Sequence, residues 1–175
     1  MKKLLLLITY FSTPAFCQNL IINNLSIPIP EGFTAPGEPL QMEDTLIYIL
    51  SKKDKDSDQS LLQIVVIETD EESDLNKTIE NNLRDTDHFG AVLLSFQRTH
   101  SEFTTKPTET TKFKGRNLHK VSFQGKSDDN WNYGDIYSLF WGSHRYLFCL
   151  MVHKNQESID FKSVSQSIAG IQEHK

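Results

Sequence analysis

The seven residues 146–152 constrain the fold of this chain more than any other segment, because all of them are apolar. Successive side chains of a β-strand point to opposite faces of the sheet, so both faces of this strand are apolar. One face would carry Phe148, Leu150 and Val152, and the other Leu147, Cys149 and Met151. Such a strand has to lie inside a sheet that is covered on both sides. We therefore expect all six of these side chains to be buried.

Further β-rich runs supply antiparallel neighbours for this central strand. Residues 133–141 precede it across Gly142 and Ser143, which predicts a hairpin with residues 145–153. Residues 45–50 and 61–68 form a second predicted hairpin, whose charged tip covers residues 52–59. Other strands are expected within 20–29, within 95–104, and from the turn at 112–116 through Phe123.

Two segments have the spacing of amphipathic helices. The acidic start at 70–74 is followed by Leu75, Ile79 and Leu83, which predicts a helix that ends before Gly90. A second stripe near the end of the chain consists of Phe161, Val164, Ile168 and Ile171. It predicts a closing helix that covers one face of the central strand. The fold class is therefore α+β, an antiparallel β-sheet with helices packed on its faces.

The first 17 residues have the pattern of a cleavable export signal. Lys2 and Lys3 precede an apolar run of about ten residues, too short to span a membrane. We expect cleavage after Cys17, with cleavage after Ala15 as the alternative; Phe16 disfavours a bacterial lipid anchor on Cys17. Residues 18–175 then form a single periplasmic or secreted domain, and none of its apolar runs is long enough for a transmembrane segment.

Charge and cysteine content narrow the classes of partner. The chain of 175 residues carries a formal net charge of −5, and loss of Lys2 and Lys3 would make the mature part −7. This balance excludes a typical nucleic-acid-binding protein and is compatible with a basic protein partner. Cys149 would be the only remaining thiol, so no internal disulfide is possible, and its apolar neighbours predict a small buried hydrophobe.

The order of these elements resembles the PsbP-like family and the secreted DcrB-like bacterial proteins. The resemblance rests on the opening strand into Ile29–Phe33, the early charged-tip hairpin, the helix at Leu75, the 113–116 turn, the aromatic hairpin and the closing helix. It spans nearly the whole mature chain. It implies an α/β/α sandwich and a family of mostly non-catalytic accessory and binding proteins, and it assigns no functional residue here.

Motifs for metal binding and catalysis are incomplete in this sequence. Asp54, Asp56 and Asp58 have the spacing of the first three ligands of a calcium loop. The sixth position is Gln59 where the loop requires Gly, and the twelfth is Val65 where it requires Glu. The six His residues form no close pair at chelating spacing, so no metal and no cofactor is predicted. The chain also has no Gly-x-Ser-x-Gly motif, and we do not expect an enzyme.

The aromatic residues of the last hairpin are the candidate binding residues. The set consists of Trp131, Tyr133, Tyr137 and Trp141, preceded by Asp128 and Asp129. Tyr137 and Trp141 share one strand face, where aromatic side chains at period two commonly form core. Trp and Tyr are also enriched at interface hot spots, so a core role and a binding role both stay open.

Three functions fit the sequence. The first is an exported, non-catalytic accessory protein of the bacterial cell envelope that binds another protein or a small ligand. The second is a periplasmic immunity protein that neutralises a toxin, which fits the export signal and the acidic balance. The third is a hydrolase whose acidic residues meet in a cleft that sequence spacing does not reveal.

Overall fold

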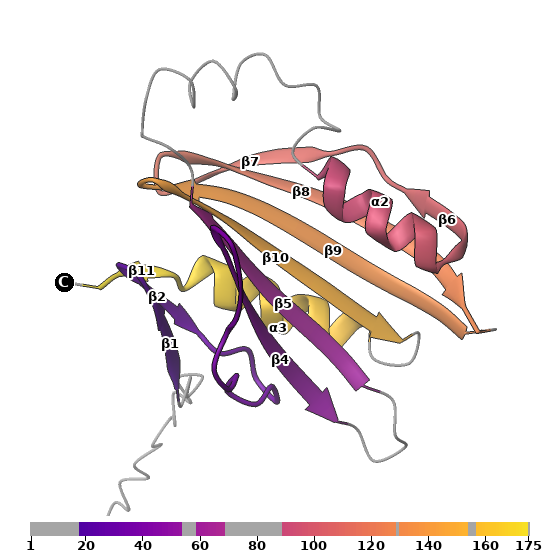
Figure 1. Ribbon diagram of the computed structural model, residues 1–175, viewed down its shortest axis with the longest axis horizontal. Helices are drawn as coiled ribbons and strands as arrows, with labels where there is room; N and C mark the ends of the chain where they lie inside the picture. The colour runs from indigo at the N-terminus through magenta and orange to yellow at the C-terminus, as the bar shows by residue number, and fades with distance from the viewer. Residues whose placement is uncertain (1–17, 54–58, 69–88, 129, 154–156, 175) are drawn as a thin grey trace, which may run out of the picture.

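The computed structural model describes residues 18–53, 59–68, 89–128, 130–153 and 157–174 (Figure 1). Its main element is an eight-stranded antiparallel sheet in the order β3-β4-β5-β10-β9-β8-β6, with β7 also paired to β8. The strands are β3 (Leu40–Met42), β4 (Thr45–Lys53), β5 (Gln59–Glu68), β6 (Ser101–Thr105), β7 (Glu109–Phe113), β8 (Arg116–Ser127), β9 (Asn130–Trp141) and β10 (His144–His153). The predicted antiparallel sheet is therefore confirmed, and the described part of the chain is mainly β.

The central position of the apolar strand is confirmed. β10 lies between β5 and β9 in the sheet. Five of the six side chains expected to be buried are buried, and Met151 is half-buried. Cys149 is buried among apolar side chains, and burial raises the pKa of its thiol to about 12. The two hairpins predicted from the sequence correspond to β4–β5 and β9–β10.

The closing helix, α3 (Glu157–Ala169), packs on one face of β10. Val164, Ile168 and the following Ile171 share a core with Leu150 and Val152, as the stripe predicted. A second, three-stranded sheet of β1 (Asn19–Ile22), β2 (Leu25–Pro28) and β11 (Gln172–Glu173) adds to the same core. The predicted opening strand within 20–29 is thus a short hairpin.

The opposite face of the sheet carries α2 (Gly90–Thr99), which lies over the end formed by β6 and β8 (Figure 1). Phe96 of α2 stacks on Phe123 of β8 with ring centroids 4.7 Å apart. Phe89 is buried beside them in a second apolar cluster that includes Cys149. The two described helices therefore contact opposite faces of one sheet.

The strand predicted at 95–104 is wrong in its first half and confirmed from Ser101 onward. Residues up to Thr99 belong to α2, and only Ser101–Thr105 form a strand, β6. Phe89, Val92, Leu93 and Phe96 pack in one cluster. Their helical spacing gives α2 an apolar stripe that contacts the sheet. The predicted export signal, the charged tip at 54–58 and the helix predicted within 70–88 lie outside the described residues.

Candidate functional site

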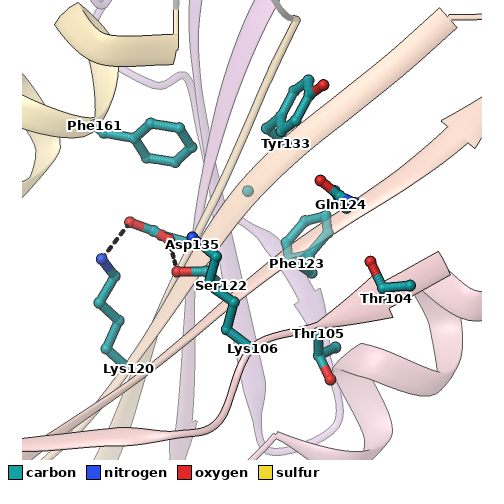
Figure 2. A pocket seen from close by; sticks show the side chains of 11 residues that line it. Thr104, Thr105, Lys106, Lys120, Ser122, Phe123, Gln124, Tyr133, Asp135 and Phe161 are labelled. Atoms are coloured by element: carbon teal, nitrogen blue, oxygen red, sulfur yellow. Dashed lines mark hydrogen bonds and ion pairs between the residues drawn. The ribbon is translucent and has the colours of Figure 1, made fainter.

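A cavity of about 400 Å³ lies between β6, β8, β9 and the first turns of α3 (Figure 2). Lys106 follows β6; Lys120, Ser122 and Gln124 belong to β8; Tyr133 and Asp135 belong to β9; Phe161 belongs to α3. Ligand pockets in proteins usually measure about 300–1,000 Å³. The cavity is therefore large enough for a small molecule.

The alternation of β8 explains why this part of the sheet is open. Val121 and Phe123 point to the α2 side and are buried, whereas Ser122 and Gln124 point to the α3 side. Ser122 is half-buried and Gln124 is exposed, because α3 packs on β10 rather than on this end of β8. Ser122 and Gln124 therefore form a polar strip of β8 at the edge of the main core.

Asp135 is a nearly buried carboxylate at the floor of this cavity, 5 % exposed. It lies in the middle of the sheet, opposite Leu150 of β10 and Ser122 of β8. The Ser122 hydroxyl donates to its Oδ1 over 2.6 Å, and the Lys120 ammonium lies 2.9 Å from its Oδ2. The Tyr137 hydroxyl donates to the same Oδ2 over 3.2 Å. Both carboxylate oxygens therefore accept hydrogen bonds, as a buried charge requires.

The polar groups of this cluster are engaged with one another. Burial, and then the charge of Asp135, raise the pKa of the Tyr137 hydroxyl, so the phenol stays protonated at neutral pH. Ser122 donates its proton to a carboxylate that also pairs with Lys120. General-base catalysis needs a group that is free to take a proton from the reacting atom. Here the engaged Asp135 oxygens fix the floor of the cavity.

The two ends of the cavity differ in character. Figure 2 shows the Phe161 and Tyr133 rings bordering the pocket at one end, and Lys106 extending into it from the other. The backbone N–H of Lys106 donates to the carbonyl of Ser122 over 2.9 Å, which holds this residue beside β8. Within the described residues, the Lys106 ammonium forms no ion pair.

The structure separates the six candidate residues of the sequence. Tyr133 lines the cavity, and Tyr137 lies beneath it as a hydrogen-bond partner of Asp135. Trp141 is 5 % exposed in the main core, where the Arg116 guanidinium lies 4.6 Å from its ring centroid. Trp131 is half-buried at the start of β9, and Asp128 is exposed in the turn before it. Asp129 lies outside the described residues.

Sequence reasoning missed the residues that form the polar part of the cavity: Lys106, Lys120, Ser122 and Asp135. A signal for Asp135 was present, because it is the single acidic residue among the alternating apolar and aromatic positions of its strand face. An acid at a position of this kind needs a partner from the neighbouring strand. Lys106 carried no comparable signal.

The described residues contain no group of three or more His, Cys, Asp or Glu residues that could hold a metal ion. They also contain no helix that is both long and apolar enough to cross a membrane.

Comparisons with known proteins relate this chain to others through its fold. No protein-family model matches it, and no curated protein matches its sequence. The solution structure of cyanobacterial PsbP (CyanoP) from Synechocystis matches with a TM-score of 0.64 at 8 % identity, over 90 % of this chain and 92 % of that one. LpqN, involved in cell envelope biogenesis of Mycobacterium tuberculosis, matches with a TM-score of 0.54 at 6 % identity, over 86 % and 83 %.

A protein of Bacteroides thetaiotaomicron gives a TM-score of 0.52 at 10 % identity, over 87 % of this chain but only 46 % of that one. Identities of 6–10 % relate backbones and do not transfer residues or activities. The resemblance inferred from the sequence therefore holds at the level of architecture, and this chain has a PsbP-like fold.

Proposed function

We propose that this chain is an exported, non-catalytic accessory protein of the bacterial cell envelope that binds a small organic ligand in the pocket beside Asp135. The observation that carries the proposal is the cavity of about 400 Å³, lined by aromatic rings and by Lys106, which forms no ion pair with any residue that the structure describes. Ligand sites typically combine an apolar lining with a few polar groups that fix orientation.

Two further observations support the location and the accessory role. The first 17 residues have the pattern of a secretory signal. LpqN, which has the same fold, is involved in cell envelope biogenesis. Ser122 donates its hydroxyl proton to Asp135, and Asp135 also pairs with Lys120; these existing contacts support a binding role without catalysis.

The test is a screen of small organic fragments by ¹H–¹⁵N NMR, comparing the normal protein with a Gln124→Trp variant. Gln124 is exposed on the pocket wall, so an indole there should occupy the cavity without disturbing the core. Fragments should shift the amides of Gln124 and Gly134 in the normal protein, and the variant should lose the shift at Gly134. Thr111→Trp, at an exposed position of β7 outside the pocket, is the matched control. A library that shifts neither amide would contradict the proposal.

The second proposal is a periplasmic immunity protein, supported by the acidic balance of the chain. Acidic surfaces steer and hold basic partners. This proposal predicts a basic secreted toxin encoded beside the gene, and binding between the two purified proteins that weakens with salt. The absence of a toxin gene beside this gene would contradict the immunity proposal.

A further inference from the structure

The class of ligand can be narrowed from the charges that line the pocket, provided that the proposed binding site is correct. Three ionisable side chains with a formal charge at neutral pH line it: Lys106, Lys120 and Asp135. The Lys120 ammonium lies 2.9 Å from the Asp135 carboxylate, so these two charges compensate each other. Among the described residues that line the pocket, Lys106 is the charge without an ion-pair partner, so this lining is net positive on a chain whose net charge is −5.

The hydrogen-bonding groups of the pocket also favour a negatively charged ligand. Both oxygens of Asp135 are already engaged, because Oδ1 accepts from Ser122 and Oδ2 accepts from Lys120 and Tyr137. An ammonium carries three donors and no acceptor, so Lys106 and Lys120 both keep N–H groups for a ligand. A cationic ligand would meet Lys106 without a free carboxylate to balance it. The pocket therefore favours an acceptor with negative charge.

The other end of the cavity is apolar. Phe161 and Tyr133 are partly buried side chains that pack against the main core, and Figure 2 shows both rings at the border of the pocket. These rings and Lys106 line one cavity, whose volume of about 400 Å³ suits a molecule with a ring or a short chain.

We propose that the pocket binds a small amphipathic organic anion, with its acidic group at Lys106 and its apolar part against Phe161 and Tyr133. Lys106 supplies the ion pair, and Lys120 contributes a second N–H while it stays paired with Asp135. Asp135 has a positioning role, because it holds Lys120 and Ser122 in the pocket wall.

The test uses three probes that share one skeleton and differ in charge: 4-phenylbutyrate, 4-phenylbutanamide and 4-phenylbutylamine. Each is titrated into the protein while the amides of Gln124 and Gly134 are followed by ¹H–¹⁵N NMR. We expect the carboxylate to bind about tenfold more tightly than the amide, because a hydrogen bond to a charged acceptor is stronger than one to a neutral acceptor. The amine should bind most weakly.

The Lys106→Met variant tests the assignment of the cation. It should weaken binding of 4-phenylbutyrate about tenfold, as expected for a partly exposed ion pair, and leave binding of the amide unchanged. Lys112→Met, at an exposed lysine of β7 outside the pocket, is the matched control and should change neither affinity. Because Lys106 is exposed, both variants should melt at the temperature of the normal protein.

Two results would overturn the inference in different ways. Equal binding of all three probes at the pocket would remove the preference for an anion and leave the proposed binding function in place. No shift of Gln124 or Gly134 with any probe would contradict the inference together with the binding function.

Discussion

At the scale of single residues, the most unusual feature is a carboxylate in an apolar sheet. Asp135 shares its strand face with Tyr137, Leu139 and Trp141, which belong to the main core. A buried charge is tolerated when its hydrogen-bond sites are filled, and here Ser122, Lys120 and Tyr137 fill them. The same contacts place a rigid polar floor beneath the pocket.

The Tyr137 hydroxyl should make stability sensitive to alkaline pH. Burial and the Asp135 charge raise its pKa above the ordinary tyrosine value of about 10, so the folded state keeps a proton that the unfolded state releases. The contribution is complete below pH 10 and is lost as pH rises above it, at up to about 1.4 kcal/mol per pH unit for one group. Urea unfolding at several pH values above 10 should show a shallower fall for Tyr137→Phe. An identical slope in both proteins would contradict this assignment.

At the scale of elements, β10 organises the molecule. It pairs with β5 and β9, and its alternate side chains enter the two separate cores. α3 covers one of these faces and is also held by an ion pair at its start. The carboxylate of Asp160, which is fully buried, lies 2.5 Å from the ammonium of Lys52 and accepts from the Ser60 hydroxyl over 2.6 Å.

Leu150→Asp should prevent folding. Leu150 is fully buried in the main core at the centre of β10, and an unpaired carboxylate there would cost several kcal/mol or become neutral. Circular dichroism and solubility report the outcome. Met42→Asp, at an apolar position of β3 that is 63 % exposed, is the control and should change stability by less than about 0.5 kcal/mol. A soluble Leu150→Asp protein with an unchanged melting temperature would show that β10 is not central.

Asp160→Ala should lower the free energy of unfolding by about 3 kcal/mol, because it removes the buried partner of Lys52 and Ser60. The loss should be smaller when Asp160→Ala is combined with Lys52→Met, since no unpaired charge is then left near the core. Chemical denaturation of the single and double variants measures both quantities. Strict additivity of the two substitutions would argue against a direct interaction.

At the scale of the whole molecule, the two sheets share a core. The small sheet brings residues from both ends of the described chain together, since β2 pairs with β1 and with β11. Leu25 and Ile27 of β2 pack in the same cluster as Val164 and Leu150. Small sheets of this size have little stability alone, so this one depends on the rest of the domain.

Leu25→Ala should therefore destabilise the entire protein by about 2–5 kcal/mol, because a fully buried leucine leaves a cavity in the shared core. Tryptophan fluorescence, which reports on Trp131 and Trp141 in β9, and far-ultraviolet circular dichroism should follow one coincident transition at lower temperature. Separate transitions by the two methods would indicate that the small sheet unfolds independently.

The sequence by itself determined the elements whose patterns are local. The doubly apolar run at 146–152 placed β10 inside the sheet, and the stripe from Phe161 to Ile171 placed α3 against it. Both hairpins followed from alternation and from the residues between their strands. α2 was misread as a strand, because its apolar residues fit either structure until Phe96 is seen to stack on Phe123.

The pocket could be recognised only from the tertiary structure. Its walls come from the end of β6, from β8 and β9, and from α3, which lie far apart along the chain. The burial of Asp135 depends on which strands flank β9, and the position of Lys106 at the pocket depends on the pairing of its backbone with Ser122 of β8. Hydrophobic periodicity records which face of an element is buried, but not which distant side chains meet there. A site assembled from long-range contacts therefore leaves little trace in local sequence.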